Sequence, residues 1–139
     1  MGYKISLETP TVEDYVNIRI AAGLSRKSAE AAEIGLSNTL CGVVVSHEGQ
    51  PVGIGRVIGD GGCFFEIVDI AVMPEHQKQG LGDKIMHALM EYINEEAPDT
   101  AYVSLMADHG TPEFYKRFGF EASLPPRKAG MSLRINRKQ

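Results

Sequence analysis

The sequence contains no tryptophan and only two cysteines, Cys41 and Cys63. Both cysteines lie in apolar, strand-like segments and lack the spacing of a metal-binding motif, which is typical of buried free thiols. A disulfide framework and a cysteine-bound zinc site are therefore not expected. We predict a protein of the reducing cytoplasm that holds no metal ion.

Long apolar runs and an excess of basic residues are also missing. No window approaches the length of a membrane span, and residues 1–8 lack the apolar region of a signal peptide. Lysine and arginine total 14 against 18 acidic residues, and the formal net charge is −4 at pH 7. This balance does not favour nucleic acid or an anionic membrane as a partner.

What is present is enough for one hydrophobic core. The chain has 139 residues, of which 43% are hydrophobic, so residues 1–139 are expected to form a single domain. The spacing of apolar residues predicts a mixed α/β sheet of about six or seven strands, flanked by about four helices. The expected strands are 3–7, 40–47, 51–58, 63–73, 101–107, 120–123 and 130–135, and the expected helices are 12–20, 25–37, 80–96 and 111–118.

The most informative segment runs from Glu66 to Lys84, where an apolar strand leads into a glycine-containing turn and then a helix. Gly80 and Gly82 have no side chain that would block a ligand. The first N–H groups of the helix have no partner within it, and the helix dipole favours an anion near them. The segment therefore predicts a phosphate-binding turn.

The residues around the glycines distinguish among the known phosphate-binding turns. A P-loop requires Gly-Lys followed by Ser or Thr, but Gly82 is followed by Asp83 and Lys84. A Rossmann fingerprint needs a third glycine near position 85, which is Ile85 here. Nucleoside triphosphates and dinucleotides are therefore not favoured.

The block Gln77-Lys78-Gln79-Gly80-Leu81-Gly82 instead resembles the signature of the GNAT superfamily of N-acetyltransferases. A second block follows at residues 104–120 and ends in Phe114-Tyr115-Lys116-Arg117-Phe118-Gly119-Phe120. Both blocks stand in the order that the family has, and together with the strand and helix between them they cover about the central half of the chain. The resemblance implies a single GNAT-like domain that uses acetyl-CoA.

The resemblance also implies which residues hold the cofactor. Backbone groups of the turn would bind the pyrophosphate, and the strand before it would bind the thioester arm. Asp108 occupies the place where many relatives have an asparagine that contacts CoA. The expected cofactor-binding residues are Ile70, Ala71, Val72, Gln77, Lys78, Gln79, Gly80, Leu81, Gly82, Asp83, Lys84, Asp108 and Tyr115.

Acetyl transfer to an amine needs a base that removes a proton from the ammonium group. Glu66 is the first candidate, since some members of the family carry a catalytic Glu or His at this position of the strand. Asp69 is the alternative base: a regular strand places it on the opposite face from Glu66, whereas a bulge would change that. A water molecule is a third alternative.

Two further groups complete the expected chemistry. Tyr115 matches the tyrosine that many GNAT enzymes use to protonate the CoA thiolate, and the N–H of Ile70 or Val72 is expected to bind the thioester oxygen. Arg56 lies on a strand and is interpreted as a solvated residue, with the acceptor cleft as the alternative.

These residues predict an N-acetyltransferase that transfers acetyl directly from acetyl-CoA to a primary amine of a small molecule. Two alternatives stay open: an enzyme that acetylates proteins or peptides, and a CoA-binding sensor without turnover. Exposed strand edges of such a sheet often pair, so a homodimer is one expected assembly.

Overall fold

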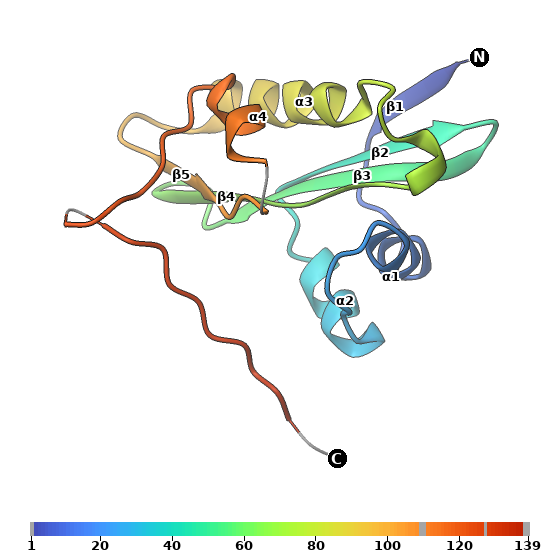
Figure 1. Ribbon diagram of the computed structural model, residues 1–139, viewed down its shortest axis with the longest axis horizontal. Helices are drawn as coiled ribbons and strands as arrows, with labels where there is room; N and C mark the ends of the chain where they lie inside the picture. Colours follow the sequence, from blue (N-terminus) through green and yellow to red (C-terminus); the bar gives the residue numbers. More distant parts are fainter. Residues whose placement is uncertain (1, 109–110, 127, 138–139) are drawn as a thin grey trace. The chain divides into compact units, whose positions relative to one another are not determined.

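The chain is described by a computed structural model covering residues 2–108, 111–126 and 128–137 (Figure 1). It divides into two compact units, Met1–Leu105 and Met106–Gln139. The first unit holds the β-sheet and three α-helices, and the second holds one short helix. The elements are β1 (Tyr3–Leu7), α1 (Val12–Ala21), α2 (Ala29–Leu36), β2 (Cys41–His47), β3 (Gln50–Gly59), β4 (Phe64–Val72), the 3₁₀ helix η1 (Pro74–His76), α3 (Leu81–Glu96), β5 (Tyr102–Leu105) and α4 (Pro112–Lys116).

The sheet has the strand order β1-β2-β3-β4-β5. The first four strands pair antiparallel, and β5 pairs parallel to β4. The parallel pair requires a crossover, which α3 provides. The predicted α/β fold with a mixed sheet is therefore confirmed, although the described residues form five strands rather than six or seven.

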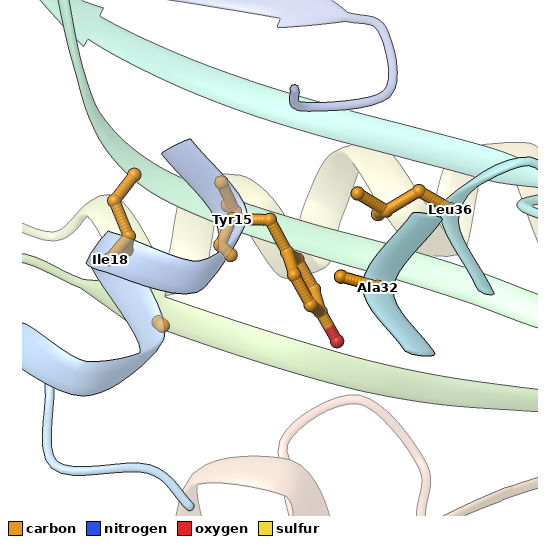
Figure 2. Packing of buried hydrophobic residues seen from close by; sticks show 6 residues of the cluster. Tyr15, Ile18, Ala32 and Leu36 are labelled. Carbon is orange, nitrogen blue, oxygen red and sulfur yellow. The ribbon is translucent and has the colours of Figure 1, made fainter. Parts of the chain in front are cut away.

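Helix α3 covers one face of the first unit's sheet, and α1 and α2 cover the other (Figure 1). Beneath α3, Val57 and Phe65 of the sheet are buried, as are Ile85 and Leu89 of the helix. The opposite face has its own buried cluster, in which Tyr15 from α1 lies over the strands beside residues from α2 (Figure 2). Both faces of the central strands β2 and β3 are thus buried, which explains their apolar runs.

Close packing of α3 on β3 depends on Gly55. A Cβ atom at this position would lie 2.5 Å from Ile85 Cγ2 and 3.2 Å from Leu89 Cδ1. Only glycine allows the helix to approach the strand this closely. This contact sets the distance between α3 and the sheet. It thereby also positions the turn that precedes the helix.

Local signals predicted both N-terminal helices correctly. Thr11 and Ser28 cap α1 and α2, and each side-chain oxygen accepts a hydrogen bond of 3.1 Å from the N–H three residues later. These bonds satisfy N–H groups that the helix itself leaves unpaired. No helix among the described residues is both long and apolar enough to cross a membrane.

The second unit corrects part of the strand prediction. Residues 120–123 and 130–135 form no strand, and the alternating side chains of Met131, Leu133 and Ile135 are 91%, 87% and 61% exposed. Alternation alone does not make a strand, because a strand needs a partner for its backbone hydrogen bonds. Helix α4 is present as predicted, and Gly119 follows it with φ 93°.

The prediction of buried thiols is wrong for Cys63. Both cysteines are free, but Cys63 is exposed and Cys41 is half-buried. Cys63 precedes β4 and belongs to a turn, so its apolar neighbours in sequence do not cover it. Burial raises the pKa of the Cys41 thiol.

Candidate active site

The turn before α3 leaves the start of the helix without a side-chain cap. Gly80 is the N-cap residue of α3 and has the left-handed backbone conformation, with φ 81° and ψ 11°. No side chain caps this end of the helix, and the hydrogen bond from Lys84 N–H to Gly80 O, 3.2 Å long, marks the first turn. The N–H groups of Leu81, Gly82 and Asp83 therefore precede the helical hydrogen bonds and suit an anion.

The side chains of the turn differ in what they offer. Lys78, Gln79 and Lys84 are exposed, whereas the Leu81 side chain is 2% exposed and belongs to the core. Leu81 can thus contribute only its backbone to a ligand. Asp83 brings a negative charge into the first turn, where its Oδ2 atom lies 3.2 Å from His87 Nδ1.

Gln77 connects the turn to the end of β4. Its Nε2 atom donates a hydrogen bond of 2.9 Å to the carbonyl oxygen of Val72. This bond joins the two predicted cofactor-binding segments, the strand and the glycine turn. We therefore assign the Gln77 side chain to positioning the turn.

Strands β4 and β5 separate halfway along β4. Their pairing ends at Ile67 and Leu105, whereas β4 continues to Val72. Met73 N–H donates to Val52 O on β3, so by alternation the N–H groups of Val72 and Ile70 point away from β3. In the described part of the chain no strand pairs with β4 beyond Ile67, and this edge carries free backbone donors.

A bulge interrupts β4 at the same place. Arg56 of β3 lies opposite Val68 and Ile54 lies opposite Ala71, so Asp69 and Ile70 are both accommodated beside one residue of β3. Asp69 has φ 64°, a conformation that is uncommon for any residue except glycine, asparagine and aspartate. Because the extra residue reverses the alternation of side chains between the two faces of the sheet, Asp69 faces α1. This is the orientation expected for a strand with a bulge.

Asp69 is enclosed by cationic groups. Its Oδ1 atom accepts hydrogen bonds from Arg19 Nη1 and, at 3.0 Å, from the Tyr15 hydroxyl, and its Oδ2 atom accepts one of 2.8 Å from Arg56 Nε. The side chains of Asp69, Arg19 and Arg56 are 5%, 8% and 8% exposed. A carboxylate whose two oxygens bind two guanidinium groups has no accessible lone pair for a proton from a substrate. The geometry therefore favours a structural role for Asp69 over a role as the base.

Arg56 corrects another prediction. It is 7% exposed and not solvated, and its Nη1 atom also donates to Gly35 O at 3.1 Å and to Thr39 Oγ1 at 2.8 Å. Sequence reasoning missed Arg19 and Tyr15 altogether. Their spacing of four residues, which places both on one face of α1, was the only local signal.

Tyr15 makes the stability of this cluster sensitive to alkaline pH. Burial raises the pKa of Tyr15, and the charge of Asp69 raises it further. The folded state thus holds the phenolic proton more tightly than the unfolded state, whose pKa is about 10. The resulting stabilisation is complete below pH 10 and is lost as the pH rises towards the folded pKa.

We expect Tyr15→Phe to lower the free energy of unfolding by about 1–2 kcal/mol at pH 8, because a buried acceptor loses one donor. The variant should also show a smaller further loss between pH 9 and pH 11 than the parent protein. Urea unfolding at both pH values measures the two effects. An identical alkaline slope for the two proteins would remove Tyr15 from this linkage.

Glu66 lies on β4 before the bulge, opposite Ile58 of β3 and Ser104 of β5. Because side chains alternate along β3, Glu66 is on the same face as Arg56. The side chain is half-buried, and among the described residues no hydrogen bond or ion pair engages its carboxylate. Of the two candidate bases in this strand, only Glu66 has a carboxylate free to accept a proton.

Tyr115 and Asp108 belong to the second unit. Tyr115 lies on α4 and is half-buried, with its ring 5.0 Å from that of Phe114 in an edge-to-face arrangement. Burial raises the pKa of Tyr115, and the negative charge of Asp108 adds to the shift. The phenol is therefore protonated at neutral pH and is able to donate a proton.

Comparison with known proteins agrees with this arrangement. Residues 38–122 match the family described as the acetyltransferase (GNAT) domain. The fold is similar to that of a probable acetyltransferase of unknown function from methicillin-resistant Staphylococcus aureus, with a TM-score of 0.90 and 43% identity over 96% of this chain and 100% of that one. A GNAT family acetyltransferase from Streptococcus pneumoniae has a TM-score of 0.76 and 26% identity over 99% of this chain and 100% of that one.

A curated relative is similar over a shorter segment. GCN5-related N-acetyltransferase 2, chloroplastic, from Arabidopsis thaliana is 35% identical over 76 residues, which are 55% of this chain and 29% of that protein. The chain thus spans less than a third of the length of this relative. The match over residues 38–122 includes both sequence blocks that suggested the resemblance. The chain belongs to the GNAT acetyltransferase family.

Proposed function

We propose that the protein transfers the acetyl group of acetyl-CoA directly to a primary amine, and that residues 1–139 act together as one GNAT-like domain. The observation that carries this proposal is the left-handed Gly80 turn, which opens α3 with uncapped N–H groups directly after β4. A diphosphate fits such a turn because it needs close backbone approach and several N–H donors. The free donors of Ile70 and Val72 support placement of the thioester along β4.

Glu66 acts as the base in this proposal. It takes one proton from the substrate ammonium and passes it to solvent, which leaves a neutral nitrogen with a lone pair. That nitrogen forms a bond to the thioester carbon while an N–H of β4 holds the carbonyl oxygen. The C–S bond then breaks, the second nitrogen proton leaves to solvent, and Tyr115 gives its proton to the thiolate and regains one from water. The sum is an amide, free CoA and one released proton.

We propose that the acceptor is a small molecule. We also propose that the protein acts in the cytoplasm. Release of the CoA thiol, measured with a panel of primary amines, tests the activity. The same assay with peptides that bear a free N-terminus or a lysine tests the protein-modifying alternative. Acetyl-CoA binding without thiol release from any amine or peptide would contradict the proposal and favour the sensor alternative.

Gly82 tests the phosphate-binding role of the turn. It is the second residue of α3 and is half-buried. We expect Gly82→Leu to abolish acetyl-CoA binding in calorimetry, because the side chain would stand where the backbone should approach the phosphates. Gly82→Ala is the matched variant: it should stabilise the helix by roughly 0.5–1 kcal/mol, which separates loss of binding from loss of fold. Retained affinity in Gly82→Leu would contradict the assignment of the turn.

Tyr115 tests the proposed acid. We expect Tyr115→Phe to lower kcat by roughly 10²-fold, with little change in acetyl-CoA affinity, because it removes only the proton donor. Tyr92→Phe on α3 is the control and should keep full activity. Since burial holds the pKa of Tyr115 above its ordinary value of 10.0, loss of activity through its ionisation should begin only above pH 10. Equal activity of Tyr115→Phe and the parent would remove this residue from the mechanism.

A further inference from the structure

The face of the sheet that α1 and α2 cover is open at the start of β4 and β5. On the α3 face of this region, Phe65 and Ile67 are 2% and 4% exposed. On the opposite face, Phe64 and Tyr102 are 62% and 42% exposed. Two large aromatic side chains thus remain accessible on a strand pair whose other face is fully packed. We call Phe64 and Tyr102 the aromatic patch.

The aromatic patch is held in place by backbone hydrogen bonds. Phe64 and Tyr102 are register partners in the parallel pair, and their ring centroids lie 6.2 Å apart at an interplanar angle of 71°. The N–H of Phe64 donates to Asp60 Oδ1 at 3.0 Å, and the N–H of Tyr102 donates to Cys63 O at 2.8 Å. An edge-to-face pair on two anchored strands binds an apolar group with little ordering cost.

Glu66 stands beside this patch. It follows Phe64 by two residues on β4 and therefore shares its face, about 7 Å further along the strand. Ser104 is its register partner on β5. The Glu66 carboxylate and the aromatic patch thus form one surface, in which the carboxylate is negatively charged and the two rings are apolar.

The charges near this surface select a substrate with a single ammonium group. The Asp60 carboxylate already accepts N–H bonds from Gly62, Cys63 and Phe64 at 2.9, 2.9 and 3.0 Å. Asp69 is held by two arginines, so that cluster has an excess of one positive charge and repels a second cation. On β4, Asp69 is held by two guanidinium groups, whereas no hydrogen bond or ion pair among the described residues engages the Glu66 carboxylate, which makes Glu66 the carboxylate of this strand available to an ammonium group.

The geometry points to a primary monoamine with an aromatic or aliphatic body a few carbon atoms from the nitrogen as the acceptor. The ammonium group binds at Glu66, and the body packs on Phe64 and Tyr102. This inference rests on the proposed acetyl transfer and names the substrate class of the same site. A polyamine would bring a second ammonium group towards the arginine cluster around Asp69, which has an excess of one positive charge.

The test compares acceptors in the thiol-release assay: n-propylamine, 3-phenylpropylamine, 1,4-diaminobutane and a short peptide with an N-terminal alanine. We expect kcat/KM for 3-phenylpropylamine to exceed that for n-propylamine by roughly 10-fold or more, mainly through a lower KM, because the phenyl ring leaves water. The diamine and the peptide should not exceed n-propylamine.

Variants test whether the aromatic patch causes the preference for 3-phenylpropylamine. Phe64→Ala should reduce the ratio of kcat/KM for 3-phenylpropylamine over n-propylamine by at least about 5-fold, and Phe64→Leu should reduce it less. Leu7→Ala is the matched control: Leu7 is a 72% exposed apolar residue on β1, at the other edge of the sheet, and its loss should not change the ratio. Thermal unfolding of each variant checks that it is folded.

The outcomes separate this inference from the function on which it rests. No thiol release with any acceptor would overturn the proposed acetyl transfer itself. Turnover with equal kcat/KM for both monoamines, or higher kcat/KM for the diamine or the peptide, would overturn only the substrate class. A preference for 3-phenylpropylamine that Phe64→Ala leaves unchanged would overturn the role of the patch.

Discussion

Asp69→Asn is expected to lower the free energy of unfolding by about 3–5 kcal/mol, the cost of leaving a buried charge without its partner. The substitution keeps the size of the side chain, and asparagine tolerates the positive φ of this position. What it removes is the negative charge between Arg19 and Arg56, whose side chains are each 8% exposed. Urea unfolding at pH 7 measures the loss.

Two comparison variants make this prediction specific. Arg19→Met should cost less than Asp69→Asn, because it leaves the neutral pair of Arg56 and Asp69 instead of two buried like charges. Glu113→Gln removes one partner of an ion pair in which Lys116 and Glu113 are 53% and 84% exposed, and it should change stability little. If Asp69→Asn cost no more than Glu113→Gln, the cluster would not stabilise the bulge.

Glu66→Gln is expected to lower kcat/KM by roughly 10²–10⁴-fold, the usual contribution of a positioned base. Glutamine keeps the shape of the side chain but cannot accept the proton of an ammonium group. Acetyl-CoA affinity in calorimetry should be unchanged, since the phosphate-binding turn is not altered. Steady-state thiol release with one amine measures the effect, and Glu95→Gln on the exposed side of α3 is the control.

The pH dependence of this variant separates a base from a binding group. An alkylamine has a pKa near 10.4, so more of it is neutral as the pH rises. The deficit of Glu66→Gln should therefore shrink between pH 7 and pH 9.5. A deficit that stays constant over this range would contradict proton removal by Glu66, and full activity of the variant at pH 7 would leave a water molecule as the base.

The parts of the site that follow from local sequence were predicted well. Gly80 and Gly82 between an apolar strand and an amphipathic helix indicated the turn, and the structure shows Gly80 with φ 81° at the N-cap of α3. Such features depend on residues that are close in sequence: glycine adopts positive φ without strain, and helical periodicity repeats every three or four residues.

The parts that depend on contacts between distant segments were not predicted. Arg56 was interpreted as a solvated residue, but it pairs with Asp69 thirteen positions away. Arg19 pairs with the same carboxylate from fifty positions away. The alternating residues of segment 130–135 suggested a strand, yet Met131 is 91% exposed and no strand forms there.

The amino-acid sequence by itself determined the order of helices and strands in the first unit, the glycine turn before α3 and the family. These properties reside in short segments whose backbone preferences and apolar spacing act over a few residues. Only the tertiary structure decided the surroundings of Glu66 and Asp69, two carboxylates three residues apart on one strand. A bulge turns Asp69 towards two arginines from distant elements, while Glu66 stays on an accessible part of the same face. Whether a carboxylate is available for chemistry depends on the groups that surround it in space, and those groups are remote in sequence.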